Sequence, residues 1–360
     1  MIAGDFAIDV GTAALLSSAY TFPYALVQPA LGVTADFFGK TRLMSWCVLI
    51  VAVAALLCAV ATSFPLLVAM RIAAGLVAGG VFPVAMALIG DLVPVGQRQV
   101  AIARLLAVGL TGNLVGSSIA GVIGDLMGWR GVFGILGSFG LIAAITAFVA
   151  FRGVVTAPPA PFNRAAVLAN FRGIFADPRA KVCFGSVFFE AVFIHGLFPY
   201  VAVLLAAIGE RRASIAGLLI AAFASGGIVY AALVPMLVAR VPERALMVAG
   251  GTVAACGLTT VALLLPWPWQ IAVYLLFGLG FYLLHGCIQV HVTELSSTAR
   301  GAAASLHSCF FYLGQAVGPV VYGYGFAHGG AEPSILVGAA VVMTVGIVCS
   351  RLLRHRRAVQ

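Results

Sequence analysis

The chain has 360 residues, of which 62% are hydrophobic and 9% charged, and its formal net charge is +9. Water-soluble domains carry about 25% charged residues, so this composition excludes an ordinary soluble fold and indicates a protein covered mostly by lipid. The basic residues form short clusters between apolar runs instead of a continuous stripe with interleaved aromatic residues, which excludes a nucleic acid as the expected partner.

Membrane-spanning helices need about 20 apolar residues at a rise of about 1.5 Å per residue. Reading the chain for such runs predicts eleven helices, and therefore an all-α polytopic membrane protein. In chain order they are Thr12–Phe37, Leu43–Thr62, Leu66–Leu92, Val100–Ile123, Gly131–Phe151, Val182–Ile208, Ile215–Ala239, Ala245–Leu265, Gln270–Thr293, Arg300–Phe326 and Ser334–Leu353.

The longest interruption of the apolar pattern covers residues 153–181 and contains the run Ala157-Pro158-Pro159-Ala160-Pro161. Proline-rich segments of this kind are extended linkers. We therefore expect an N-terminal bundle of five helices in residues 1–152, a linker in 153–181, and a C-terminal bundle of six helices in residues 182–360.

Positive charges are unequally divided between the two sides of the predicted membrane protein. Sixteen of the twenty Lys and Arg residues fall on one side, three fall on the other, and Arg71 lies inside a span. Because cytoplasmic loops are enriched in Lys and Arg, the C-terminus is expected in the cytoplasm and the N-terminus outside. The expected location is the cell membrane, in the bacterial case the inner membrane.

An internal repeat relates the two predicted bundles. A shift of 202 positions places Arg98 on Arg300, Gly112 on Gly314, Asn113 on Gln315, Gly116 on Gly318 and Gly121 on Gly323. The glycines, with Pro319, predict close helix packing. Two duplicated halves would each hold six helices, so we expect a further apolar span of about 20–30 residues upstream of Thr12. Sequencing the upstream reading frame tests this expectation.

The loop after the first predicted helix reads "GVTADFFGKTR" and contains Gly32, Asp36, Gly39, Lys40 and Arg42. This G-x-x-x-D-x-x-G spacing followed by cations resembles the cytoplasmic loop of the major facilitator superfamily, although a phenylalanine stands where that family usually has a cation. The resemblance extends over essentially the whole chain. It implies a major-facilitator-type fold of twelve helices in two bundles, of which this chain holds eleven, and secondary transport by alternating access.

The same loop predicts a gate. Gly39 allows a tight turn, Gly32 allows close helix approach, and Lys40 and Arg42 are placed to pair with Asp91. The resemblance implies that Asp36 interacts with the start of the helix near Arg300, whose dipole favours an anion. These residues are expected to latch the cytoplasmic side shut. The alternative is a basic membrane anchor with an incidental carboxylate.

The resemblance also implies that the helices carrying Arg71, Glu190 and His285 line the central cavity. Glu190 lies about 12 Å inside its span, where a carboxylate is costly, which makes it the leading candidate for proton coupling. A structural carboxyl hydrogen-bonded within the bundle is the alternative. Arg71, about 9 Å inside its span, either binds or couples, or its side chain reaches back to the interface.

Further polar and aromatic residues are candidates for substrate or proton binding. His195 follows Glu190 by five positions, a rotation of about 140° that need not share its face, whereas His285 and Gln289 do share a face. The remaining candidates are Tyr20, Tyr24, Gln28 and Asn113. A structural hydrogen bond is the alternative for His285, and packing is the alternative for the aromatic residues.

No phosphate loop, nucleophile constellation or HExxH motif is present in the sequence, so no enzyme activity and no cofactor are expected. His285, Cys287 and His291 do not converge on one helix face, so no metal site is expected. The segment Gly112–Gly121 aligns with an antiporter motif of the family, with Ser117 and Ala120 replacing its Pro and Gly. We therefore expect a monomeric, proton-coupled exporter of a small organic solute. A proton-coupled importer of a sugar or organic acid, and a nontransporting receptor or inactive truncated product, are the alternatives.

Overall fold

The computed structural model describes residues 1–154, 164–296 and 299–353. Within its helices, the side chains of residues 31–38, of several positions between 95 and 110, and of residues 164 and 166 lie outside the described residues. Two residues of the predicted gate, Gly32 and Asp36, therefore lie outside the description.

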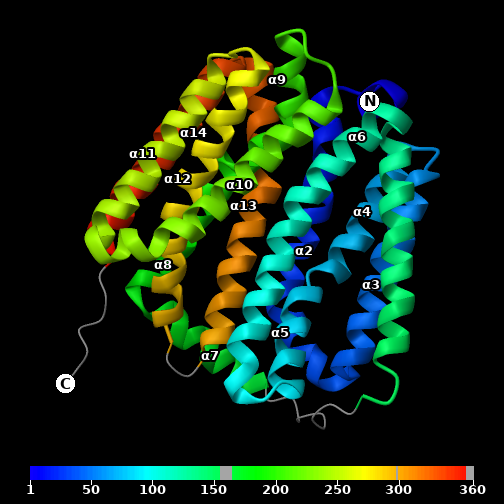
Figure 1. The fold of residues 1–360 in the computed structure, drawn as a ribbon, viewed down its shortest axis with the longest axis vertical. Coiled ribbons are helices and arrows are strands. Elements are labelled where there is room, and N and C mark those ends of the chain that lie inside the picture. The colour runs from blue at the N-terminus through cyan, green and yellow to red at the C-terminus, as the bar shows by residue number, and fades with distance from the viewer. Residues whose placement is uncertain (155–163, 297–298, 354–360) are drawn as a thin grey trace. The chain divides into compact units, whose positions relative to one another are not determined.

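Every regular element of the described chain is helical (Figure 1). In order these are α1 (Ile2–Asp5), α2 (Val10–Phe38), α3 (Lys40–Ala59), α4 (Phe64–Ala78), α5 (Val81–Leu92), α6 (Val95–Ala150), α7 (Arg164–Ala176), α8 (Pro178–Phe193), the 3-10 helix η1 (His195–Tyr200), α9 (Val201–Ala207), α10 (Ala213–Arg240), α11 (Glu243–Ala262), α12 (Trp267–Glu294), α13 (Arg300–His328) and α14 (Ala331–Leu352).

Nine helical segments of the described residues are long and apolar enough to cross a membrane. One of them lies within α6, which contains Gly128 at φ 68° and ψ −178°, and the ribbon of α6 reverses direction part-way along (Figure 1). Helix α6 therefore makes two passes. Helix α13 is not among the nine, but with 29 residues it is as long as the other spans. The all-α membrane fold predicted from the sequence is confirmed.

Two predicted spans are interrupted inside. Helices α4 and α5 meet at Gly79 and Gly80. The span that starts with α8 passes through the 3-10 helix η1, which holds Pro199, a residue without the N–H that a regular helix needs. Because η1 begins at His195, the five-residue spacing from Glu190 no longer corresponds to the rotation of a regular α-helix.

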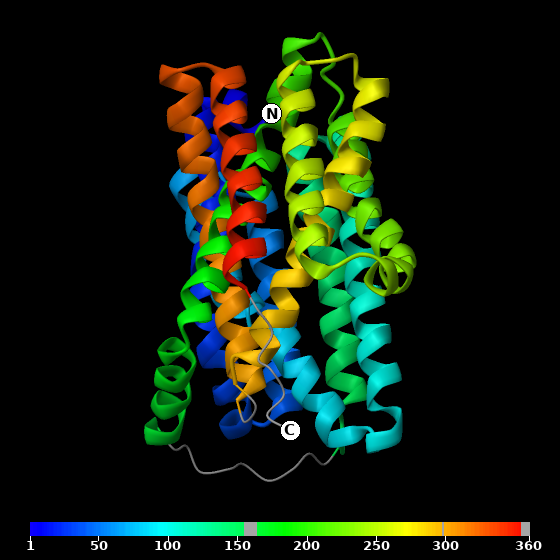
Figure 2. The ribbon, with the colours of Figure 1, turned by 90° about the vertical axis from the view of Figure 1, so that its left-hand side faces the viewer.

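The second half of the expected linker is not extended, because residues 164–176 form helix α7 (Figure 2). Its Ile174 is fully buried and Phe171 packs against the same hydrophobic cluster, three positions apart on one helix face. Phe175 makes an edge-to-face contact with Phe184 of α8, with ring centroids 5.6 Å apart. These apolar contacts turn the segment into a helix docked on the following bundle. The run 157–161 lies outside the described residues.

The chain forms two compact units. Unit 1 comprises Met1–Gly112 and Ile123–Arg164, and unit 2 comprises Asn113–Val122 and Ala165–Gln360. Residues 113–122 belong to unit 2 because Gly121 packs on α10: a Cβ at Gly121 would lie 2.6 Å from the Ala213 carbonyl oxygen. The contact boundary thus differs from the expected division at residue 152.

Unit 1 is held together by close glycine contacts between α4 and α2 and by hydrogen bonds to the Asp5 carboxylate. A Cβ at Gly75 or Gly79 would lie 2.2 or 2.6 Å from the backbone oxygens of Tyr20 and Tyr24, so α4 packs directly on the backbone of α2. At the chain start, the Trp129 indole N–H and the Arg130 guanidinium donate to Asp5, at 2.8 and 2.6 Å. These two donors hold the pKa of the Asp5 carboxyl below its usual value.

Unit 2 uses the same kind of backbone approach. A Cβ at Gly318 would lie 2.5 Å from both the Gly196 Cα and the Val192 oxygen, and one at Gly314 would lie 2.2 Å from the Phe188 oxygen. The Tyr200 hydroxyl donates to the Pro319 carbonyl at 2.7 Å, next to this crossing. Close packing of α13 on α8 and η1 therefore matches the predicted roles of Gly314, Gly318 and Pro319.

Close packing is not found at two other predicted glycines. A Cβ at Gly112 or Gly116 would meet no atom of the described structure within 4 Å. The close packing predicted at these two glycines is therefore not found among the described residues, although α10 approaches the neighbouring Ser117: a Cβ at Gly217 would lie 2.4 Å from the Ser117 oxygen.

We predict that Gly318→Ala lowers the free energy of unfolding by about 1–3 kcal/mol, because the new methyl group overlaps backbone atoms that cannot rotate away. Gly116→Ala is the matched control, and it should be neutral or slightly stabilising because its methyl group enters open space. Thermal unfolding of both purified variants in one detergent measures the difference. Equal destabilisation of the two would contradict the crossing described here.

Candidate polar sites in the membrane bundles

A buried ion-pair geometry lies in the core of unit 2. The Glu190 carboxylate of α8 is fully buried, and its Oε2 lies 2.8 Å from Nδ1 of His285 on α12, whose side chain is 16% exposed. The two positions are 95 residues apart in sequence. The structure thus joins two residues that the sequence placed on separate helices, and it gives Glu190 the partner that a carboxylate in a membrane interior requires.

Two further histidines complete the cluster around Glu190 and His285. The ring of His307, on α13, lies 5.0 Å from the His285 ring between centroids and is almost fully buried. The His195 ring packs edge-on against Phe281 and Phe311, at 4.8 and 4.9 Å, and Phe281 and Phe311 also contact His285. We call Glu190, His195, His285 and His307 the histidine cluster.

Several polar atoms of the histidine cluster have no hydrogen-bond partner within the described part of the chain. They are Oε1 of Glu190, Nδ1 of His195 and Nε2 of His307. Imidazole binds and releases protons near neutral pH, and an unpartnered buried acceptor gains a hydrogen bond when a proton or a water reaches it. This arrangement can therefore hold a proton in unit 2 and pass it between neighbouring side chains.

The other predicted substrate or proton candidates lie apart from the histidine cluster or outside unit 2. Gln289 is exposed, so His285 faces Glu190 instead of its neighbour one turn away. The rings of Tyr20 and Tyr24 contact each other in unit 1, with centroids 5.8 Å apart and planes tilted by 34°, and Gln28 on the same helix is buried. Asn113 is exposed on α6. The sequence stripe on α2 is therefore a real helix face, packed against α4.

Arg71 lies inside unit 1 against aromatic rings. Its guanidinium carbon is 4.2 Å from the Tyr20 ring centroid and 5.8 Å from that of Phe133. Cation–π contacts of this kind stabilise a desolvated cation by about 2 kcal/mol. The aromatic contacts explain how an arginine is tolerated at this depth.

The predicted gate region contains one ion pair among its described residues. Gly39, with φ 79°, is the single residue between α2 and α3, and this left-handed conformation favours glycine. The next residue, Lys40, lies 2.7 Å from Asp91 in the last turn of α5, and both side chains are mostly buried. Arg42 is exposed. The structure thus fastens the start of α3 to the end of α5.

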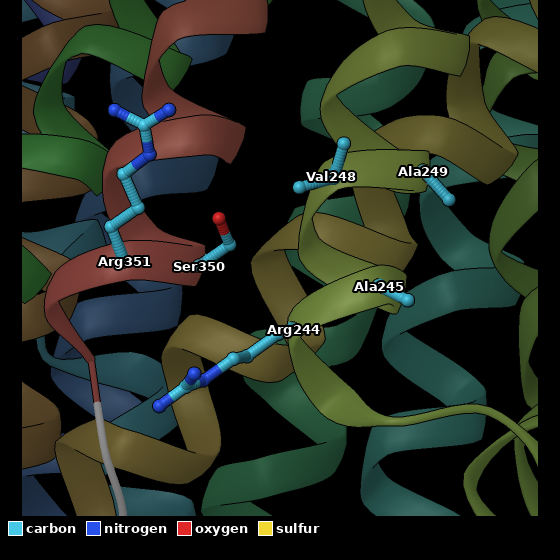
Figure 3. A pocket seen from close by; sticks show the side chains of 6 residues that line it. All are labelled: Arg244, Ala245, Val248, Ala249, Ser350 and Arg351. Atoms are coloured by element: carbon cyan, nitrogen blue, oxygen red, sulfur yellow. The ribbon is translucent and has the colours of Figure 1, made fainter.

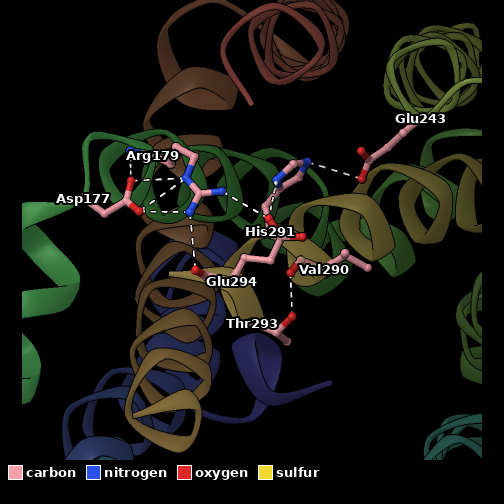
Figure 4. Close-up of polar contacts among 7 residues, drawn as sticks. All are labelled: Asp177, Arg179, Glu243, Val290, His291, Thr293 and Glu294. Atoms are coloured by element: carbon pink, nitrogen blue, oxygen red, sulfur yellow. Dashed lines mark hydrogen bonds and ion pairs between the residues drawn. The ribbon is translucent and has the colours of Figure 1, made fainter. Parts of the chain in front are cut away.

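A second charged network lies at one end of unit 2 (Figure 4). Asp177 caps α8, accepting from the Arg179 backbone N–H at 2.9 Å, and the Arg179 guanidinium bonds both Asp177 and Glu294, at 3.0 and 3.2 Å. His291, fully buried, lies 3.3 Å from Glu243 and 4.0 Å from Glu294. The network fastens the ends of α8, α11 and α12 together.

The two end networks occupy equivalent places in the internal repeat. The shift of 202 positions carries Lys40 and Asp91 to within two residues of Glu243 and His291. In unit 1 the cation, Lys40, begins α3 and the carboxylate, Asp91, lies in the last turn of α5. In unit 2 the carboxylate begins the helix and the basic group ends the span. The contact is retained while its charges are exchanged.

Comparison with known proteins agrees with this architecture. The family model described as Major Facilitator Superfamily matches residues 1–319. The chain belongs to the Major Facilitator Superfamily.

Two proteins and one solved structure are similar to the chain. It is 25% identical to the uncharacterized MFS-type transporter YfhI of Bacillus subtilis, over 97% of this chain and 86% of that protein. It is 31% identical to the chloramphenicol resistance protein of Streptomyces lividans, over 44% of this chain and 39% of that protein. A crystal structure of a D-xylose-proton symporter matches with a TM-score of 0.74 and 16% identity, over 96% of this chain and 89% of that one.

Membership of the superfamily makes the chain a multi-pass membrane transporter for small molecules and not an enzyme. The histidine cluster and the two end networks are thus polar sites of a transporter, and the histidine cluster lies within the spans, where polar groups are most costly.

Sequence reasoning missed His307, Arg179, Asp177, Glu243 and Glu294. His307 precedes Phe311 by four positions in the predicted tenth helix. Nothing in that spacing indicates that His307 lies in the same cluster as Glu190. The other four stand at the ends of apolar runs on one predicted side, and a search for opposite charges at helix ends would have found them.

We predict that Arg179→Ala lowers the free energy of unfolding by about 2–4 kcal/mol, because it leaves the nearly buried Asp177 without its cation. Arg212→Ala is the matched control, because Arg212 also pairs with a carboxylate two residues away but is 58% exposed. The control should cost less than about 1 kcal/mol. Thermal unfolding in detergent compares the two, and similar losses would contradict a structural role for the Arg179 network.

Proposed function

We propose that the chain is a proton-coupled exporter of small organic solutes that works by alternating access between its two halves. The single observation that carries the proposal is the buried Glu190–His285 pair with His307 and His195 around it. The partial similarity to a chloramphenicol resistance protein supports a small organic compound as the substrate. The two halves are the bundles 1–152 and 182–360, with the N-terminus outside and the C-terminus in the cytoplasm.

The histidine cluster suits proton coupling because it joins three helices through groups that change charge. When Glu190 is ionised and His285 protonated, the pair attracts α8 to α12. A proton added to Glu190 weakens that attraction. Binding of a proton shifts the equilibrium between two conformations only if the Glu190–His285 contact differs between those conformations. Coupling therefore requires that α8 and α12 move relative to each other during transport.

The substrate contacts proposed in the N-terminal half are Arg71, Tyr20, Tyr24, Gln28 and Asn113. Arg71 already lies over the Tyr20 ring, so a substrate carrying a negative group or a flat ring would find a cation beside an aromatic surface. Gln289 is the proposed polar contact in the other half.

The loop residues Gly32, Asp36, Gly39, Lys40 and Arg42, with Asp91, are proposed as the cytoplasmic latch. The Lys40–Asp91 pair supports this role because it fixes the short connection at Gly39 to the end of α5. Movement of α5 is then transmitted through Lys40 to the connection at Gly39.

We predict that Glu190→Gln abolishes transport driven by a pH gradient while substrate exchange at equal pH persists. The amide keeps the shape of the side chain but cannot bind and release a proton, and a positioned proton-transfer group contributes about 100-fold or more in rate. Proteoliposomes preloaded with chloramphenicol, the first probe suggested by the relative, measure efflux with and without a gradient. Glu332→Gln, at an exposed glutamate on α14, is the control.

The same assay distinguishes export from import. Proton entry that accompanies substrate exit supports export, whereas proton and substrate entering together would favour the importer. An unchanged pH dependence in the Glu190→Gln protein would contradict the coupling role of the histidine cluster.

We predict that Asp91→Asn slows turnover about fivefold and leaves equilibrium substrate binding unchanged, because a partly buried ion pair of about 1 kcal/mol is lost far from the substrate. The double variant Lys40→Asp/Asp91→Lys restores the pair with reversed sign and should recover most of the rate. Arg152→Gln removes an exposed cation and serves as control. Equal loss of binding and turnover in Asp91→Asn would contradict the latch.

A further inference from the structure

Two arginines from different helices share one open groove on unit 2. Helix α11 contributes Arg244, Ala245, Val248 and Ala249, and helix α14 contributes Ser350 and Arg351, around a volume of about 710 Å³ (Figure 3). Arg244 and Arg351 are both exposed. The lining holds two cations, one hydroxyl and three small or branched apolar side chains, and none of its residues is acidic.

Packing of the two helices explains why the groove exists. Helices α11 and α14 touch backbone to backbone at Gly251 and Gly346, where an added Cβ would lie 3.0 Å from the partner glycine's Cα. The groove lies one to two turns from that contact, toward the start of α11 and the end of α14. Small side chains at Ala245 and Ala249 leave space there instead of filling it.

The electrostatic character of the groove favours an anion. Arg244 lies in the first turn of α11, where the helix dipole is positive and no side chain caps the Pro242 N-cap. Arg351 lies in the last turn of α14. The acidic residue of that first turn of α11, Glu243, lies beside His291 of α12. Neither arginine is used by the end network or the histidine cluster.

The apolar residues that line the groove favour a lipid over a soluble anion as its ligand. Val248, Ala245 and Ala249 line the groove together with the two arginines, and Val248 points from α11 toward α14 (Figure 3). Both helices are long and apolar enough to cross a membrane. The sequence continues directly after α14 with Arg354, His355, Arg356 and Arg357. Basic residues clustered at the end of a membrane span are attracted to anionic lipid headgroups.

We propose that the groove formed by Arg244 and Arg351 binds the phosphodiester headgroup of an anionic phospholipid, with its acyl chains lying along the apolar side of α11 and α14. Arginine suits this role because its planar guanidinium donates two parallel hydrogen bonds to phosphate oxygens. The Ser350 hydroxyl is available for a further hydrogen bond. This site is independent of the proposed direction and coupling of transport.

Native mass spectrometry of the purified full chain, titrated with phosphatidylglycerol, measures the binding. The wild type should retain phosphatidylglycerol saturably and phosphatidylcholine much less. Loss of each arginine should weaken retention about fivefold, so Arg244→Gln/Arg351→Gln should weaken it on the order of 30-fold. The control Arg152→Gln/Arg240→Gln removes the same charge from two exposed arginines elsewhere and should bind like the wild type.

A second variant tests the groove without removing an arginine. Ala249→Glu places a carboxylate on the exposed wall, and it should lower phosphatidylglycerol retention about fivefold or more through repulsion while phosphatidylcholine retention is unchanged. Thermal unfolding in phosphatidylcholine bicelles verifies that each variant is folded. Such exposed substitutions usually change stability by less than about 0.5 kcal/mol.

Two results would overturn the proposal. Retention of phosphatidylglycerol that is equal in the Arg244→Gln/Arg351→Gln variant and the wild type would remove the groove as its site, as would equal loss in the control pair. Displacement of the lipid by millimolar inorganic phosphate, with the same stabilisation against heat, would identify a soluble-anion site instead.

Discussion

Inside a membrane bundle a polar side chain has no water to bind, and the protein itself must supply its partner. In unit 2 this constraint accounts for the position of Glu190, which is fully buried and meets His285 from another helix. In unit 1 it accounts for Arg71, which has an aromatic surface instead of a carboxylate. The two contacts behave differently, because the Glu190–His285 pair can change its charge by binding a proton whereas the cation–π contact of Arg71 does not.

Close backbone contact is what allows such partners to meet. Gly314 and Gly318 bring α13 against α8 and η1, the elements that carry Glu190 and His195. The interruption of the span by η1 then turns His195 toward the aromatic rings of α10, α12 and α13. Small residues and one proline thereby decide which polar groups share the core of unit 2.

The ends of the spans follow the same repeat with different chemistry. Unit 1 joins the start of α3 to the end of α5 through Lys40 and Asp91, while unit 2 joins the start of α11 to the end of α12 through Glu243 and His291. Lysine is charged throughout the physiological pH range, whereas histidine is charged only when protonated. The two halves therefore carry end contacts of different chemistry, an ammonium–carboxylate pair in unit 1 and an imidazole–carboxylate pair in unit 2.

The sequence by itself determined the membrane class, the eleven helical passes and the superfamily, because long apolar runs and the loop at Gly39 and Lys40 are local patterns. It also placed Lys40 near Asp91, since both stand at helix ends on one predicted side. It did not determine the helix at residues 164–176, whose stability comes from burying Ile174 against remote side chains. Only the tertiary structure decided that Glu190 of α8 meets His285 of α12 and that His285 meets His307 of α13, because contacts between different helices depend on how the helices cross and not on spacing within one helix.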